Sequence, residues 1–276
     1  MGSGHGSSNG YSISDSNSKN DNAAGSCRPT PVIEVSDLSV TYHDKGAGIF
    51  ARKAELEVIR NLTLELHEGE ILGLVGESGC GKSTLARTIV GLERNFTGQV
   101  IHKTSRPQMV FQDPYTSLNP SMTVRRIVEE PLILAKIRDR NTRRDKVIET
   151  LSLVGLGPEY LNRLPRELSG GQRQRVNIAA ALIAEPKVLI ADEPVSALDA
   201  TIQVQILDLL WELHQKLNLS ILLISHDLAV VENLCKRVLI MQNGRIIESG
   251  PVKTIFENPE QPYTRVLIEA SRIRTQ

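Results

Sequence analysis

The sequence predicts an α/β fold whose core is a mostly parallel sheet, with a mainly helical insertion and a small antiparallel sheet. Three observations support this prediction. Short apolar runs at residues 71–75, 188–191 and 221–224 indicate strands that are buried on both faces. A glycine-rich loop and then a helical pattern directly follow the first run. From about residue 114 to residue 168, apolar periodicity is helical, charge rises and strand patterns disappear.

The remaining elements follow in chain order. Residues 32–42 and 57–66 alternate apolar and polar side chains, which is typical of half-buried strands. Apolar residues between Ile202 and Leu217 repeat at helical spacing. Asn243-Gly244 separates two short apolar runs and predicts a β-hairpin. Residues 1–30 are rich in glycine, serine and asparagine and are predicted to be a disordered tail.

The composition excludes several functional classes. The 276 residues carry 32 basic and 32 acidic side chains, and this zero balance argues against a general nucleic-acid binder. No run of about eighteen apolar residues is present, and the beginning of the chain lacks the apolar region of a signal peptide. We therefore expect a cytoplasmic protein. Its three cysteines have neither metal-ligand spacing nor an evident pairing.

The glycine-rich loop GESGCGKST predicts a nucleotide phosphate site. Its glycines allow backbone N–H groups to turn toward the phosphates, and the helix that follows presents its positive end to them. Lys82 is expected to reach the β- and γ-phosphates and to act in catalysis, whereas Ser83 is expected to bind Mg²⁺. A glycine-rich turn without a ligand is the alternative. The predicted nucleotide contacts in this loop are Gly76, Glu77, Ser78, Gly79, Cys80, Gly81, Lys82, Ser83 and Thr84.

Two adjacent carboxylates end the second buried run. Asp192 and Glu193 stand where burial is costly unless a metal or another group compensates the charge. Asp192 is suited to a Mg²⁺ shell, through water. Glu193 is suited to activate the water that attacks the γ-phosphate, as a general base. The alternative is an exposed pair of carboxylates that caps the next helix.

Ser169-Gly170-Gly171-Gln172 has the form of a helix capping box. A glycine-rich helix start can also approach an anion closely, because capping and anion binding use the same N–H groups. Tyr42 is the best candidate to stack on adenine, since aromatic residues make up only 4% of the chain. The alternative for Tyr42 is an ordinary tyrosine at a strand end.

Together, the motifs GESGCGKST, LSGGQRQR and VLIADEP, followed by Ser225-His226, resemble the ATP-binding cassette (ABC) ATPases. The resemblance covers most of the chain from about residue 31. It implies a phosphate-loop NTPase core with a helical subdomain and a small antiparallel β-subdomain. It also implies hydrolysis of ATP to ADP and phosphate with Mg²⁺. Because one cassette is encoded, a second ATPase subunit, identical or different, would complete the sandwich.

The resemblance assigns roles to further residues. Gln112 would bind Mg²⁺ and link the core to the helical subdomain, although a glutamine before Asp-Pro is usually part of a turn. His226 would contact the γ-phosphate and act in catalysis, although a lone histidine at a strand end is more often structural. Asp199 would lie across the contact between two chains. The residues expected to touch the nucleotide of the partner chain are Ser169, Gly170, Gly171, Gln172 and Asp199.

Two further segments, 112–120 and 258–265, resemble the peptide and nickel importer ATPases. Gln261 stands where that group often has histidine. The connector 101–107 is shorter than is usual there and predicts a trimmed antiparallel sheet. The predicted domain limits are 31–256 for the ATPase domain, with the helical subdomain at about 114–170. Residues 257–276 would form the importer-type C-terminal motif.

The predicted function is therefore an ATPase subunit that powers a membrane importer for peptides or nickel chelates. It would lie on the cytoplasmic face of the inner membrane, bound to permease subunits and served indirectly by an extracytoplasmic solute-binding protein, without nucleic acid. One alternative is an ATPase of a soluble complex, such as a carbon–phosphorus lyase accessory protein. Another is a DNA-repair or translation-type ABC protein, which usually carries insertions or a second cassette that this chain lacks.

Overall fold

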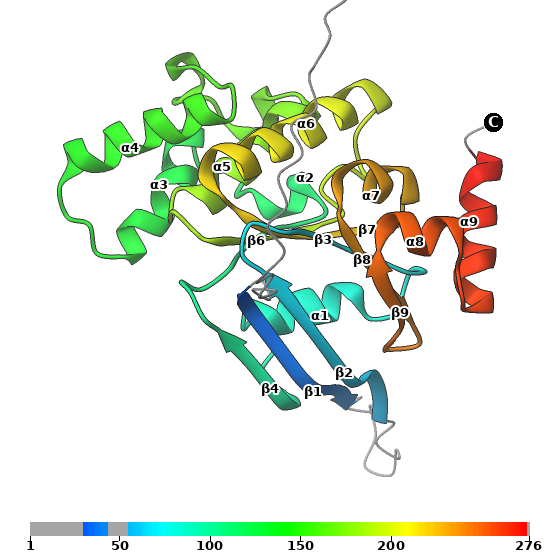
Figure 1. Ribbon diagram of the computed structural model, residues 1–276. Helices are drawn as coiled ribbons and strands as arrows, with labels where there is room; N and C mark the ends of the chain where they lie inside the picture. Colours follow the sequence, from blue (N-terminus) through cyan, green and yellow to red (C-terminus); the bar gives the residue numbers. More distant parts are fainter. Residues whose placement is uncertain (1–29, 44–54, 275–276) are drawn as a thin grey trace, which may run out of the picture.

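The computed structural model describes residues 30–43 and 55–274, so the predicted N-terminal tail lies outside them except for Thr30. A six-stranded sheet forms the centre of the molecule, in the order β5-β6-β7-β3-β8-β9 (Figure 1). Neighbouring strands are parallel except for the last pair. The strands are β3 (Ile71–Val75), β5 (Gln108–Val110), β6 (Val188–Asp192), β7 (Ser220–Ser225), β8 (Arg237–Gln242) and β9 (Arg245–Pro251).

A second, antiparallel sheet has the order β2-β1-β4, with β1 at Pro31–His43, β2 at Glu55–His67 and β4 at Phe96–His102. The alternating patterns correctly predicted β1 and β2, but they did not reveal β4. Most of its side chains are at least partly exposed, and Gly98 interrupts the pattern. Gly98 has φ +92°, and a Cβ there would lie 2.4 Å from the carbonyl oxygen of Asp37. The antiparallel sheet has three strands, with β2 and β4 at its edges. The trimming expected from the short connector 101–107 stays a prediction.

The central sheet is buried on both faces, as the continuous apolar runs predicted. Leu72 and Leu74 of β3 face a core that is shared with the antiparallel sheet and with helix α1 (Lys82–Ile89). Ile71 and Val75 of the same strand face the larger core formed with the other helices. Helix α1 therefore lies between the two sheets (Figure 1).

Helices follow one another from residue 114 to residue 182, with no strand among them. Thr123 caps α3 by accepting from the N–H of Arg126, and Asp139 caps α4 by accepting from the N–H of Thr142. The limits of a subdomain at about 114–170 stay a prediction. The helices are α2 (Pro114–Ser117), α3 (Val124–Leu134), α4 (Arg140–Leu153) and α5 (Gly170–Leu182), with 3₁₀ turns at Pro158–Tyr160 and Pro165–Glu167.

The C-terminal part contains α6 (Ala200–Leu217), α7 (Leu228–Leu234), α8 (Val252–Glu257) and α9 (Pro262–Arg274). The predicted hairpin joins β8 to β9, with Asn243 at φ +48° and Gly244 at φ +79°. Two consecutive left-handed residues are what a type I′ turn requires. Within residues 30–43 and 55–274, no helix combines the length and the apolar character needed to cross a lipid bilayer.

Candidate nucleotide-binding site

Four loops meet at one edge of the central sheet, because β5, β6, β7 and β3 are neighbours and parallel. The carboxyl ends of parallel strands lie at the same edge, where open α/β sheets bind ligands. Gln112 follows β5, Glu193 follows β6 and His226 follows β7, while the phosphate loop joins β3 to α1. These loops enclose a pocket of about 370 Å³. Its walls are formed by Val58, Ser78, Gly79, Gly81, Lys82, Ser83, Thr84, Gln112, Glu193 and His226.

Two glycines of the phosphate loop are required by its geometry. A Cβ on Gly76 would lie 2.2 Å from the carbonyl oxygen of Met241, so only glycine lets the loop pass β8 this closely. Gly81 has φ +111° and precedes α1 as its N-cap residue. Gly81 therefore lets the chain turn directly into α1. The first N–H groups of a helix have no acceptor within it, so the start of α1 can bind an anion.

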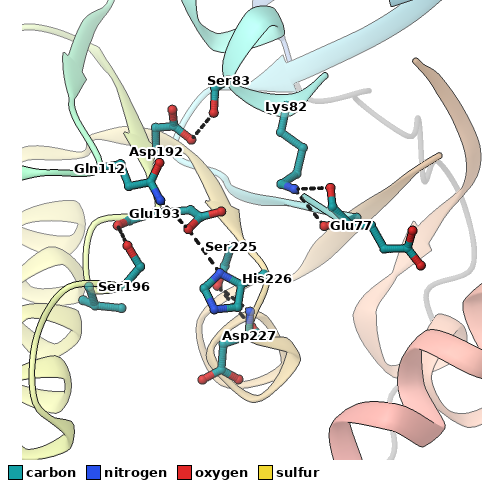
Figure 2. A network of polar contacts seen from close by, with 12 residues as sticks. Glu77, Lys82, Ser83, Gln112, Asp192, Glu193, Ser196, Ser225, His226 and Asp227 are labelled. Atoms are coloured by element: carbon teal, nitrogen blue, oxygen red, sulfur yellow. Dashed lines mark hydrogen bonds and ion pairs between the residues drawn. The ribbon is translucent and has the colours of Figure 1, made fainter. Parts of the chain in front are cut away.

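The side chain of Lys82 is buried against the phosphate loop. Its side chain is only 5% exposed, although it belongs to the first turn of α1. The ammonium group donates to the carbonyl oxygens of Gly76 at 2.7 Å and Glu77 at 2.9 Å (Figure 2). These two bonds hold the charge at the side of the pocket where the loop begins.

Ser83, which lines the pocket, contacts Asp192 at the end of β6. The Ser83 hydroxyl donates to the Asp192 carboxylate at 3.3 Å (Figure 2). Burial raises the pKa of Asp192 and the adjacent charge of Glu193 raises it further, while the Ser83 bond and the Arg87 and Lys82 charges oppose the shift. A carboxylate that is destabilised in this way gains from a nearby cation.

Glu193 is held by its backbone and by two side chains. It has φ +46°, and its N–H donates to the carbonyl oxygen of Ile224 in β7 at 3.0 Å. Its Oε2 accepts from the Gln112 amide at 3.0 Å and lies 3.2 Å from Nδ1 of His226 (Figure 2). Ser196 donates to its carbonyl oxygen at 3.2 Å. The carboxylate thus lies between the loops that follow β5 and β7.

The glycine-rich segment at 169–172 begins α5 away from this pocket. Ser169 and Gln172 form the predicted capping box: the Gln172 N–H donates to the Ser169 hydroxyl at 3.3 Å, and the Ser169 N–H donates to the Gln172 side chain at 3.0 Å. A Cβ on Gly171 would lie 2.6 Å from Cγ2 of Ile202, so glycine also allows α5 to pack closely against α6. Ser169 itself is exposed.

Some candidate residues lie apart from the pocket walls. Tyr42, at the end of β1, is 37% exposed and is not among the residues that line the pocket. Its hydroxyl bonds to Glu93, just beyond α1. Asp199 is exposed and caps α6 by accepting from the N–H of Ile202 at 3.1 Å. Val58 lines the pocket without having been predicted, because nothing in its strand pattern distinguishes it from its neighbours.

Comparison with known proteins agrees with this geometry. The family model described as "ABC transporter" matches residues 59–196. The oligopeptide transport ATP-binding protein OppF of Salmonella typhimurium is 44% identical over 257 residues, which are 87% of this chain and 77% of the relative. The dipeptide transport ATP-binding protein DppF of Haemophilus influenzae is 40% identical and covers 88% of this chain and 78% of its own length. The glutathione import protein GsiA of Pectobacterium atrosepticum is 44% identical, and the match covers 41% of its length.

Solved structures show the same architecture. The dimeric cassette MJ0796, in a post-hydrolysis state with ADP and Pi, superposes with a TM-score of 0.69 at 28% identity, and the match covers 80% of this chain and 98% of that one. Clostridium perfringens cbiO1, part of the complex cbiONQ, gives a TM-score of 0.70 at 26% identity, with 89% and 99% covered. The predicted α/β cassette fold is thereby confirmed. The chain belongs to the ABC transporter family and is one of its ATP-hydrolysing ATP-binding cassettes.

Proposed function

We propose that this chain is the ATPase subunit of a membrane importer whose cargo is peptides. One observation carries the catalytic part of the proposal: Lys82, Ser83, Gln112, Glu193 and His226 line a single pocket at the carboxyl edge of the sheet. The choice of cargo rests on relatives that are 40–44% identical over most of the chain and are named for oligopeptide and dipeptide transport. Nickel, which the sequence also suggested, stays a prediction.

In the proposed reaction, the phosphate loop wraps the phosphates of ATP and Lys82 compensates their charge. Glu193 accepts the proton of the attacking water, and the bond from water to the γ-phosphorus forms as the bond to the leaving ADP oxygen breaks. Gln112 and His226 hold the Glu193 carboxylate from both sides at 3.0 and 3.2 Å, so its orientation is set before the water arrives. His226, half exposed, would also contact the γ-phosphate.

The donor set fits Mg²⁺. Ser83 and Asp192 are already in contact, and the oxygens of a hydroxyl, a carboxylate and the Gln112 amide are the ligands that Mg²⁺ prefers. Within residues 30–43 and 55–274, no group of three or more His, Cys, Asp or Glu side chains is placed so that it could hold a metal ion. In nucleotide sites, Mg²⁺ is usually bound by one or two protein oxygens together with water and substrate phosphates. Bound there, Mg²⁺ would neutralise phosphate charge.

We further propose that two such chains close around ATP. Ser169 and Asp199 are exposed at the starts of α5 and α6 and stand outside the chain's own pocket, so they are free to face the nucleotide of a partner. The dimeric cassette MJ0796 provides the precedent. Tyr42 would stack on adenine after its side chain turns away from Glu93. Permease subunits would bind the closed pair on the cytoplasmic face of the membrane, with a solute-binding protein on the opposite face.

Copurification tests the transporter assignment. The chain would be expressed together with the permease genes that neighbour it, extracted in detergent and isolated through a tag on this chain. We expect permease subunits to accompany it, and ATP hydrolysis in vesicles to rise when peptide and solute-binding protein are supplied. Stable association with a soluble enzyme complex, and none with membrane subunits, would instead support the alternative of a soluble accessory ATPase.

A further inference from the structure

The C-terminal helix contacts the phosphate loop directly. The hydroxyl of Tyr263, in the first turn of α9, accepts a hydrogen bond from the backbone N–H of Glu77 at 3.1 Å. Burial raises the pKa of Tyr263, so the phenol stays protonated at neutral pH. The contact joins residues that lie 186 positions apart in the chain.

The bonded peptide group is also the one that holds Lys82. The N–H of Glu77 and the carbonyl of Gly76 belong to the same planar peptide unit. Lys82 donates to that carbonyl at 2.7 Å, while Tyr263 takes the N–H on the opposite side. Because hydrogen bonds through one amide polarise each other, the tyrosine both orients this plane and strengthens it as an acceptor for the ammonium group.

Hydrogen bonds from side chains fix the backbone just before Tyr263. The Glu248 carboxylate, in β9, accepts from the N–H groups of Glu260 at 2.8 Å and Gln261 at 3.2 Å. The Arg265 guanidinium donates to the carbonyl oxygens of Pro259 at 2.9 Å and Glu260 at 3.3 Å. Backbone donors and acceptors just before α9 are thus fixed to side chains, so the position of its first turn is well defined.

We infer that Tyr263 is a positioning residue for ATP binding: through the peptide between Gly76 and Glu77 it sets where Lys82 stands relative to the phosphates. The inference rests on the proposed nucleotide site. It assigns the C-terminal motif, which lies outside the segment matched by the family model, a role in the chemistry of the pocket. A tyrosine that merely packed α9 would affect stability but not the binding of phosphates.

The test compares Tyr263→Phe with Thr264→Val in the full-length chain. The first variant removes only the hydroxyl that accepts from Glu77. The second removes the hydroxyl of the next residue, which is buried and has no hydrogen-bond partner among the described residues. We expect Tyr263→Phe to raise the Kd for ADP and ATP about two- to tenfold, the range for one hydrogen bond. The weak affinity of Tyr263→Phe for AMP, which has no β-phosphate, should equal that of the wild-type chain. In Thr264→Val, the affinities for AMP, ADP and ATP should all stay unchanged.

Backbone amide exchange of Glu77 gives a readout that is independent of nucleotide. It should accelerate in Tyr263→Phe and remain at the wild-type rate in Thr264→Val. Wild-type affinities in Tyr263→Phe, equal losses for AMP and ATP, or an unchanged Glu77 exchange rate would each overturn the inference. Failure of the wild-type chain to bind ADP or ATP would instead contradict the proposed nucleotide site itself.

Discussion

The side chain of Lys82 is almost fully buried, and its ammonium group donates to two carbonyl oxygens of the phosphate loop. Its replacement by alanine removes the group that we propose compensates phosphate charge in a desolvated site. We expect Lys82→Ala to lower ATP hydrolysis by about 10²-fold or more while the fold is kept. Steady-state hydrolysis by the assembled transporter measures this effect, with circular dichroism as the control for folding. Turnover near the wild-type rate at saturating ATP would refute the role of Lys82.

Glu193 is the proposed general base, and Glu193→Gln keeps its size while removing its proton affinity. Loss of a general base typically slows a reaction by about 10²–10⁴-fold. We expect ATP to be bound but hardly hydrolysed, so that the closed pair accumulates. Light scattering with Mg-ATP should reveal a larger species than without nucleotide. Wild-type turnover together with an unchanged mass would count against this assignment.

The raised pKa of Asp192 makes the stability of the folded chain depend on pH. Its pKa is raised chiefly by burial, so the folded state binds this proton more tightly than the unfolded chain does. The stability contributed by the protonated carboxyl is complete below the ordinary pKa of aspartate and is lost as pH rises through the raised value. Asp192→Asn should therefore raise the melting temperature at pH 7 and have little effect in acid, while Mg-ATP hydrolysis is impaired. An equal shift in melting temperature at both pH values would contradict burial as the cause.

At the scale of elements, the contact between α5 and α6 depends on the absence of a side chain at Gly171. A Cβ there would overlap Cγ2 of Ile202 at 2.6 Å. Gly171→Ala should cost about 1–3 kcal/mol of unfolding free energy, as overpacking typically does. Ile202→Ala removes the clashing atom, so Gly171→Ala should cost much less in the Ile202→Ala background than in the wild-type chain. Urea unfolding of both single variants and the double variant measures the coupling, and strictly additive effects would exclude this clash.

The elements also show what sequence patterns can predict. The phosphate loop was predictable because its contacts lie within a few residues of each other: Lys82 bonds to Gly76 and Glu77. The buried strands were predictable because both of their faces are covered. Strand β4 was not, since it is an edge strand with mostly exposed side chains. The contact between Tyr263 and Glu77 depends on how α9 docks on the sheet, and no local pattern carries that information.

At the scale of the whole molecule, the proposed sandwich makes each site a product of two chains. If the working pair is this chain with itself, a chain with Lys82→Ala and a chain with Ser169→Arg should each be inactive alone. In a mixed pair both lesions fall on one composite site, and the other site keeps an intact Lys82 and an intact Ser169. Mixing should therefore restore part of the wild-type rate of ATP hydrolysis, unless hydrolysis requires both sites to be intact. Chains that carry both substitutions should stay inactive in any combination.

Cross-linking gives a test of the sandwich that does not depend on activity. Native Cys80 of the phosphate loop and a cysteine introduced as Ser169→Cys should form a bridge between chains in Mg-ATP, and this pair leaves the proposed Mg²⁺ ligand Ser83 unchanged. Burial raises the pKa of the Cys80 thiol, so an added oxidant at mildly alkaline pH would drive the reaction. Cys80→Ser in the same chain is the control that should lose the bridge. The Glu193→Gln background would keep the pair closed during the reaction. Bridges confined to single chains would rule out the sandwich.

The left-handed backbone of Glu193 has a consequence for protein engineering. Residues other than Gly, Asn and Asp are disfavoured at φ +46°, so glutamate at this position costs about 1 kcal/mol or more. Neighbours in a regular strand point to opposite faces, so this turn lets Glu193 line the pocket while Asp192 bonds to Ser83 of the pocket wall. A selection for heat resistance alone would push position 193 toward asparagine or glycine. Variants of this chain that are selected for thermal stability should therefore be screened for hydrolysis at every round, because Glu193 is the proposed general base.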